Sequence, residues 1–162
     1  NALVCPFHGW VYNRDGTLRG AARPKSFPER DKTEFGLTPL ARMVTWSIGG
    51  VAPNRMGIGP VPATAKALER AGLTLAQMDV IELNEAFAAQ GLAVLRDLGL
   101  ADDDARVNPN GGAIALGHPI GCSGAFIATK AIYELQRTGG QHALVTMCIG
   151  GGQGIAAVFE RI

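Results

Sequence analysis

Three short motifs beyond the middle of the chain combine side chains that can move protons with glycines that allow sharp turns. They are NEAF at 84–87, GHP at 117–119 and CIGGG at 148–152. Each falls where a predicted strand or loop meets a helix or a turn, and ligands bind at such edges of α/β sheets. The sequence therefore predicts one site that these three motifs form together.

His118 lies shortly before a predicted helix. The positive end of the helix dipole disfavours protonation of an imidazole at that position. A neutral imidazole can accept a proton near pH 7 and act as a base. On position alone, a structural or surface histidine is an equally open interpretation.

Cys148 and Asn84 each admit two interpretations as well. Cys148 could be a small buried apolar side chain. The glycines that follow it, Gly150 among them, would let backbone N–H groups face a developing oxyanion. Asn84 could cap the following helix or hydrogen-bond a ligand. The residue types alone leave both pairs of alternatives open.

The elements that must position these motifs alternate between strands and helices after residue 37. Apolar residues that recur at i, i+3 and i+4 predict helices, and alternating or continuous apolar runs predict strands. The predicted order is a strand at 44–48, a helix at 62–71, a strand at 80–83, a helix at 85–98, a further short strand, a helix at 124–135 and strands at 143–149 and 155–159. The last two runs suit central strands that are covered on both faces. The fold class is therefore α/β, with a mixed sheet between helix layers.

The first 36 residues have a different composition, with prolines, aromatic residues and charges. A hairpin is predicted around 11–18, with Gly16 in its turn, and residues 23–32 read as an irregular linker. We place a boundary near 35–39, which divides the chain into an appendage at 1–36 and an α/β domain at 37–162.

Composition excludes several classes of function. Fifteen basic and fourteen acidic residues give a net charge of +1, which argues against a nucleic-acid partner. The sequence contains no apolar run of the roughly 18 residues that span a membrane. Three scattered cysteines do not make a disulfide framework, so we expect a cytoplasmic location.

The motifs, in this order, resemble the C-terminal half of thiolases. The matching stretches are MGIGP at 56–60, NEAF at 84–87, NPNGGAIALGHP at 108–119 and CIGGGQG at 148–154. The resemblance implies a thiolase-fold half and acyl transfer between 3-oxoacyl-CoA and CoA, with CoA as substrate and no cofactor. Residues 91–96 and 98–103 look most like β-ketoadipyl-CoA thiolases of aromatic catabolism.

The resemblance also implies roles for individual residues. His118 would activate a nucleophilic cysteine and, with a water held by Asn84, stabilise the thioester or enolate oxygen. Cys148 would shuttle the proton of the acetyl methyl carbon, and the Gly150 N–H would join an oxyanion hole. Two further residues would line the acyl and pantetheine pocket, Met56 and Phe87.

The nucleophilic cysteine of thiolases belongs to their N-terminal half, and nothing before residue 37 matches its setting. We therefore expect the isolated chain to be inactive, with an N-terminal thiolase half and a homo-oligomer as partners in full-length relatives. Cys122 is expected to pack inside the fold.

The CPFHGW stretch at 5–10 resembles the second ligand loop of Rieske 2Fe–2S proteins, in particular the alpha subunit of ring-hydroxylating dioxygenases. A Rieske centre needs two cysteines and two histidines. Cys5 and His8 would supply only half of that set, so we expect no assembled 2Fe–2S cluster. Two alternatives to a thiolase half stay open, namely a non-catalytic CoA-binding remnant and a Rieske-type electron-transfer fragment.

Overall fold

The computed structural model describes residues 39–162 and three short strands before them. These strands, β1 (Leu3–Val4), β2 (Val11–Tyr12) and β3 (Leu18–Gly20), form an antiparallel sheet in the order β1-β2-β3. The pairing of β2 with β3 confirms the predicted hairpin. Cys5, His8 and the predicted linker at 23–32 lie outside the described residues.

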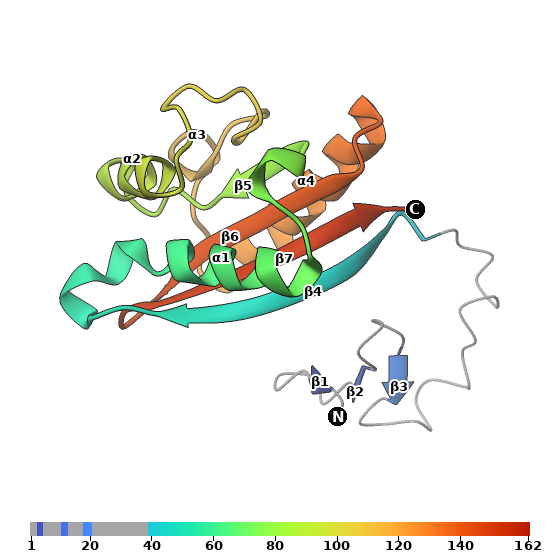
Figure 1. The fold of residues 1–162 in the computed structure, drawn as a ribbon, viewed down its shortest axis with the longest axis horizontal. Coiled ribbons are helices and arrows are strands. Elements are labelled where there is room, and N and C mark those ends of the chain that lie inside the picture. Colours follow the sequence, from blue (N-terminus) through green and yellow to red (C-terminus); the bar gives the residue numbers. More distant parts are fainter. Residues whose placement is uncertain (1–2, 5–10, 13–17, 21–38) are drawn as a thin grey trace.

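A four-stranded mixed sheet forms the centre of the described domain (Figure 1). Its strands stand in the order β4 (Ala41–Gly50), β7 (Gln153–Arg161), β6 (His142–Gly150) and β5 (Val80–Leu83). β5 and β6 are parallel, and the other pairs are antiparallel. The two nearly continuous apolar runs became the central strands β6 and β7, as predicted.

Helices connect the strands. In chain order they are the 3-10 turn η3 (Pro53–Ile58), α1 (Pro60–Ala71), the 3-10 turn η4 (Leu75–Gln77), α2 (Ala88–Asp97), the single turn α3 (Ala113–Leu116) and α4 (Ser123–Thr138). Glycines in the left-handed conformation follow α1 and α4, as the pattern of helix ends predicts.

Two details of the prediction were wrong. The short strand expected between the second and third helices is only a parallel bridge between Val107 and Ile81. The helix expected from 85 begins at Ala88, because Phe87 has extended backbone angles (φ −144°, ψ 142°) that cannot belong to a helix. α3, between α2 and α4, was not predicted.

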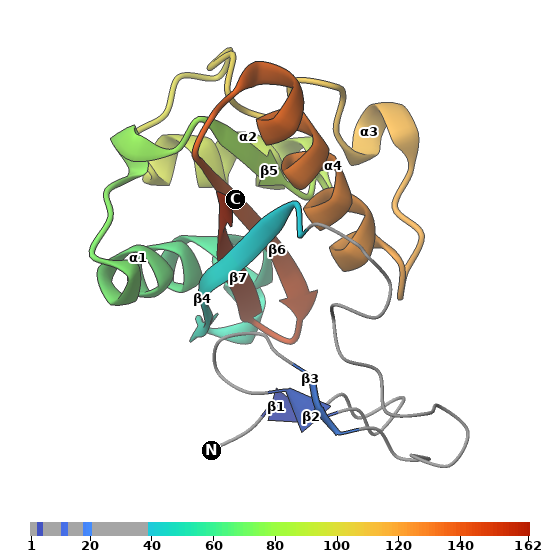
Figure 2. The same cartoon turned by 90° about the vertical axis from the view of Figure 1, so that its right-hand side faces the viewer.

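The core lies on both faces of the sheet (Figure 2). On one face α1 packs against β6 and β7, and on the other face α4 does so. The first cluster includes Ala63, Ala67, Leu144 and Val158, and the second includes Ile127, Ala131, Leu135, Val145 and Phe159. This arrangement confirms the predicted α/β/α layers.

One part of the sheet carries exposed apolar side chains. On the edge strand β4, Met43, Trp46 and Ile48 are 40%, 38% and 44% exposed. Trp46 pairs with Ala157, which packs in the α4 cluster, so these side chains lie on the face that α4 covers only in part. No helix among the described residues is both long and apolar enough to cross a membrane.

Candidate active site

β5 and β6 run parallel and end at the same end of the sheet (Figure 1), and the GHP motif joins them there through the contact of His118 with Asn84. The N–H of Asn84 donates to the carbonyl of Thr146 (3.0 Å), so the NEAF motif continues directly from β5 beside β6. Cys148 lies two residues beyond Thr146 on β6. Carboxyl ends of parallel neighbours share an edge, which is why these two motifs come together.

Asn84 and His118 are in contact. The side-chain Nδ2 of Asn84 lies 3.4 Å from Nε2 of His118, although 34 residues separate them. Asn84 is 1% exposed, whereas His118 is an exposed residue. On its second nitrogen, Nδ1, the ring contacts the hydroxyl of Ser123 at 2.6 Å. His118 is therefore held from both sides, which a free surface histidine would not be.

Cys148 is buried at the end of β6. Burial raises the pKa of its thiol, so the group stays protonated at neutral pH. Along β6 it alternates with Met147, which packs in the α4 cluster, so Cys148 approaches the sheet edge from the other face of its strand. Among the described residues, no hydrogen bond joins Cys148 to His118.

The glycines after Cys148 make the turn between β6 and β7. All three glycines of this turn have positive φ, namely Gly150 (92°), Gly151 (60°) and Gly152 (86°). Residues with a Cβ rarely adopt this backbone conformation. The carbonyl of Gly152 accepts from the N–H of Val51 (2.7 Å), which ties this turn to the segment that leads into η3. The Gly150 backbone is thus presented at the sheet edge next to Cys148.

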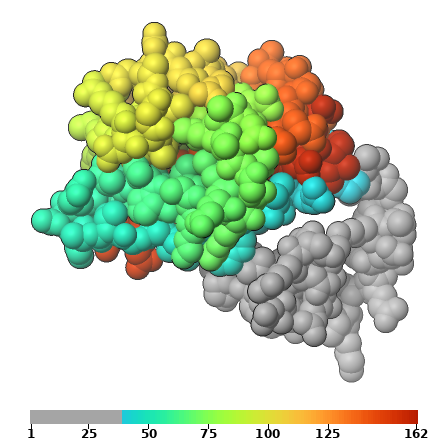
Figure 3. Space-filling view, viewed as in Figure 1, coloured from blue at the N-terminus to red at the C-terminus, as the bar shows by residue number. Residues whose placement is uncertain are grey.

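Met56 and Phe87 flank the same edge. Met56 is half-buried on η3, and Phe87 is 63% exposed just before α2. η3 and α2 lie next to each other at this end of the molecule (Figures 1 and 3), where a Cβ on Gly57 would contact Gln90. An exposed aromatic ring at the mouth of a polar edge is suited to contact a ligand.

Cys122 does not pack inside the fold, contrary to the prediction. It is exposed and occupies the cap position before α4. A side chain at the cap lies outside the first helical turn, so the apolar periodicity of α4 does not apply to it.

Sequence reasoning missed a clamp that holds the loop before His118. The side-chain amide of Asn108 pairs with the backbone of Leu83, accepting from its N–H and donating to its carbonyl, both at 2.9 Å. Nδ2 of Asn108 also donates to Glu85 (2.9 Å), and the other carboxylate oxygen of Glu85 accepts from the N–H of Ile114 (3.1 Å). The clamp of Asn108 and Glu85 thus joins β5 to the loop that carries His118.

A buried ion pair also holds this loop, in addition to the clamp of Asn108 and Glu85. The ammonium group of Lys130 on α4 donates to Glu82 (2.8 Å) and to the carbonyl of Gly111. Glu82 is fully buried, and this burial raises the pKa of its carboxyl group despite the lysine.

The sequence signal for the clamp of Asn108 and Glu85 was present in the NPNGG stretch at 108–112. Asparagine tolerates the positive φ (46°) that Asn108 adopts.

We expect Asn108→Asp to destabilise the domain by about 2 kcal/mol or more, because the NH2 group that donates to two oxygens is lost and a second carboxylate faces Glu85. Urea unfolding at pH 7 measures the loss. Asn54→Asp, the same chemical change at an exposed position of η3, is the matched control. Equal unfolding midpoints for both variants would show that the clamp contributes nothing.

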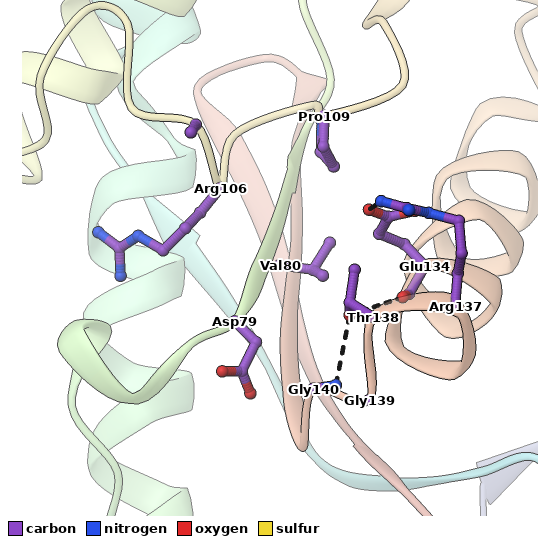
Figure 4. Close-up of a pocket in the computed structure, with 10 residues that line it drawn as sticks. Asp79, Val80, Arg106, Pro109, Glu134, Arg137, Thr138, Gly139 and Gly140 are labelled. Atoms are coloured by element: carbon purple, nitrogen blue, oxygen red, sulfur yellow. Dashed lines mark hydrogen bonds and ion pairs between the residues drawn. The ribbon is translucent and has the colours of Figure 1, made fainter.

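A hollow of about 540 Å³ opens at the opposite end of β5 (Figure 4). Its charged groups already have protein partners. Arg137 pairs with Glu134 (2.6 Å) and lowers the pKa of that carboxyl group to about 2, and Arg106 pairs with Asp104 (2.6 Å). The hollow contains no residue of the three motifs, and in the described part of the chain no three potential ligands gather to hold a metal ion.

The comparisons with known proteins all point to one family. The model of the family "Thiolase, C-terminal domain" matches residues 37–161. The 3-oxoadipyl-CoA/3-oxo-5,6-dehydrosuberyl-CoA thiolase of Escherichia coli is 59% identical over 150 residues, which cover 93% of this chain and 37% of that protein. Beta-ketothiolase BktB of Cupriavidus necator is 62% identical over 146 residues, covering 90% of this chain and 36% of that protein.

Solved structures agree with the sequence match. The acetyl-CoA acetyltransferase of Bacillus anthracis superposes with a TM-score of 0.77 at 48% identity, over 83% of this chain and 34% of that chain. Human mitochondrial 3-ketoacyl-CoA thiolase in complex with CoA gives 0.76 at 52% identity, over 80% and 32%. The chain spans little more than a third of the curated relatives. With the motifs, the fold and these matches in agreement, the chain belongs to the thiolase family, and residues 37–161 are its thiolase C-terminal domain.

Proposed function

We propose that residues 37–162 supply one half of a thiolase active site, which transfers an acyl group between 3-oxoacyl-CoA and CoA. The observation that carries the proposal is the contact of Asn84 with Nε2 of His118 at the sheet edge where the Cys148 strand ends. A base, an amide donor and a protonated thiol at one edge are the groups that carbon–carbon cleavage next to a thioester requires.

In the proposed reaction, Nε2 of His118 takes the thiol proton of a nucleophilic cysteine, whose sulfur then bonds to the 3-oxo carbon of the substrate. The carbon–carbon bond breaks, and its electron pair becomes the enolate of acetyl-CoA. Cys148 gives its proton to the enolate carbon. The sulfur of a second CoA then attacks the acyl-enzyme and its proton returns to Cys148, while His118 returns the first proton to the departing cysteine sulfur.

The raised pKa of Cys148 fits the role of proton donor, because a thiol that is already ionised could not protonate the enolate. The amide of Asn84 would hold a water against the developing oxyanion, and the Gly150 N–H would do the same from the β6–β7 turn. Met56 and Phe87 would contact the acyl and pantetheine parts of the substrate. CoA is the substrate, and no cofactor is part of the proposal.

The nucleophile is proposed to come from an N-terminal thiolase half, which corresponds to the remaining length of the matched relatives. The exposed face of β4 carries Met43, Trp46 and Ile48 and supports a partner surface there. Covering large apolar side chains on an edge strand removes apolar surface from water and so stabilises a complex. Homo-oligomerisation and a cytoplasmic location belong to the same proposal.

For the substrate we propose β-ketoadipyl-CoA, a step in aromatic catabolism. The support is the 53–62% identity to several curated β-ketoadipyl-CoA thiolases. The three motifs retain their reactive side chains, which argues against a non-catalytic CoA-binding remnant. Asn84 and His118 are in contact, and Cys148 lies at the same edge of the sheet.

For residues 1–36 we propose an origin in a Rieske protein, supported by the CPFHGW stretch alone. Alignment with the thiolase relatives over 93% of the chain also takes in part of this segment. With Cys5 and His8 as the only ligands, no 2Fe–2S cluster is expected. A stoichiometric Rieske-type electron paramagnetic resonance signal after anaerobic iron loading would overturn that expectation.

The proposed function is tested with what we call the rebuilt enzyme, a curated β-ketoadipyl-CoA thiolase whose matched C-terminal residues are replaced by residues 37–161 of this chain. We expect CoA-dependent cleavage of β-ketoadipyl-CoA by the rebuilt enzyme and none by the 162-residue chain alone, because acyl transfer needs the sulfur nucleophile. CoA binding by a folded rebuilt enzyme without cleavage would instead favour the non-catalytic remnant.

A further inference from the structure

We propose that Ser123 is a positioning residue that fixes the tautomer of His118, keeping the proton on Nδ1 and the lone pair on Nε2. The catalytic consequence of this inference rests on the proposed function, but the tautomer itself does not. Ser123 opens α4 and was not singled out by any sequence motif with a chemical role.

The contacts of Ser123 favour the arrangement of protons in which both of its side-chain contacts are hydrogen bonds. Its Oγ lies 2.6 Å from Nδ1 of His118 and 3.2 Å from the carbonyl oxygen of Pro119. A carbonyl can only accept, so both contacts are hydrogen bonds when the single hydroxyl proton of Ser123 is donated to Pro119. In that arrangement the hydroxyl oxygen accepts, and its donor is the N–H at Nδ1 of His118.

This arrangement determines the other side of the ring. A neutral imidazole carries its proton on one nitrogen only, so Nε2 is left as an acceptor. The group that faces it, Nδ2 of Asn84 at 3.4 Å, is a donor and is therefore matched to the lone pair. The opposite tautomer would set two donors against each other at this contact. The direction of proton donation thus runs from Asn84 through His118 and Ser123 to Pro119.

The two partners of the ring are buried, although His118 itself is exposed. Ser123 is 2% exposed and Asn84 is 1% exposed, so bulk water has little access to either of these partner groups. The backbone N–H groups of Cys122 and Ser123 also donate to the carbonyl of Pro119 (2.9 and 3.0 Å), which fixes the turn between His118 and α4. With the proton on Nδ1, Nε2 carries the lone pair that a base toward a thiol requires, and a thiol would replace the 3.4 Å contact with Asn84.

The test is a nitrogen-15 NMR measurement of the histidine side chains in the full chain. Long-range proton–nitrogen correlation, at a pH about two units above the ordinary histidine pKa of ~6.5, distinguishes the two neutral tautomers. His118 is assigned by the signals that disappear in His118→Gln. His142, which lies 3.9 Å from Glu160 and far from Ser123 in the fold, serves as the internal control.

We expect the wild-type ring to carry its proton on Nδ1. In Ser123→Ala the population of the form protonated on Nε2 should rise measurably, because only the longer 3.4 Å contact with Asn84 then favours the proton on Nδ1. Ser123→Thr, which keeps a hydroxyl, should retain the wild-type tautomer. The signals of His142 should stay unchanged in both. A wild-type ring protonated on Nε2 would overturn the inference without any variant, and so would a folded Ser123→Ala chain with an unchanged tautomer.

The rebuilt enzyme gives the catalytic readout. Ser123→Ala should lower kcat about 10-fold or more with little change in the KM for CoA, and Ser123→Thr should restore most of it, since a misplaced imidazole proton blocks the base. A purely structural serine would change stability but would leave the tautomer unchanged. If the unaltered rebuilt enzyme had no activity, the proposed function would fail while the NMR result still decided the role of Ser123.

Discussion

In the rebuilt enzyme, His118→Ala and Cys148→Ala each lower kcat by about 100-fold or more, the usual scale for a positioned acid or base. His118→Ala removes the acceptor that Asn84 and Ser123 hold in place. Cys148→Ala removes the protonated thiol at the end of β6. Steady-state thiolysis of β-ketoadipyl-CoA measures both effects.

Cys122→Ala is the matched control for the cysteine variant. Cys122 is exposed, and as the cap residue before α4 it makes no side-chain hydrogen bond to the helix, so its loss should leave kcat nearly unchanged. Thermal unfolding of each variant separates loss of chemistry from loss of fold. An essential Cys122 together with a dispensable Cys148 would mean that the roles had been assigned to the wrong sulfur.

Gly154→Ala should be the most destabilising of the substitutions considered for this domain, by about 3 kcal/mol or more, because overpacking against atoms that cannot move is costly. A Cβ at Gly154 would lie 2.1 Å from the carbonyl carbon of Gly59 and 2.4 Å from the nitrogen of Pro60. Both are backbone atoms where η3 passes into α1, so relief requires the helix to shift away from β7.

Urea unfolding of the 162-residue chain measures this effect, with Gly50→Ala as the control. Gly50 also lies at the end of a strand in the same sheet, yet a Cβ there meets no atom within 4 Å. Its substitution should change the free energy of unfolding by no more than about 0.5 kcal/mol. Similar midpoints for the two variants would contradict the close approach of η3 and α1 to the β6–β7 turn.

Much of the fold could be predicted because the signals were local and periodic. The i, i+3, i+4 pattern of α4 and the continuous apolar runs of β6 and β7 each imply one kind of element, and the structure contains them. The start of α2 was placed too early because no residue type at 85–87 marks the extended backbone of Phe87. Between α2 and α4 the chain makes one bridge only, at Val107, in place of the short strand that the alternation of elements predicted.

The candidate site was predictable to the level of motifs but not of partners. Asn84 follows β5 directly and His118 lies shortly before α4, so both residues were expected at the same edge of the sheet. The contacts of Ser123, Asn108 and Glu85 depend on side-chain hydrogen bonds between residues up to 29 positions apart, which leave no periodic trace in the sequence. Cys122 was misplaced for a related reason, since a cap residue does not follow the helix pattern after it.

The most direct test of the central claim is the position of the CoA sulfur in a crystal structure of the rebuilt enzyme with CoA bound. We expect this sulfur at the edge where β5 and β6 end, between Cys148 on one side and the His118–Asn84 pair on the other. Nε2 of His118 should be within hydrogen-bond reach of it, about 3 Å, or one water away. A CoA sulfur bound elsewhere, or a Cys148 thiol directed away from the cavity that holds it, would contradict the account.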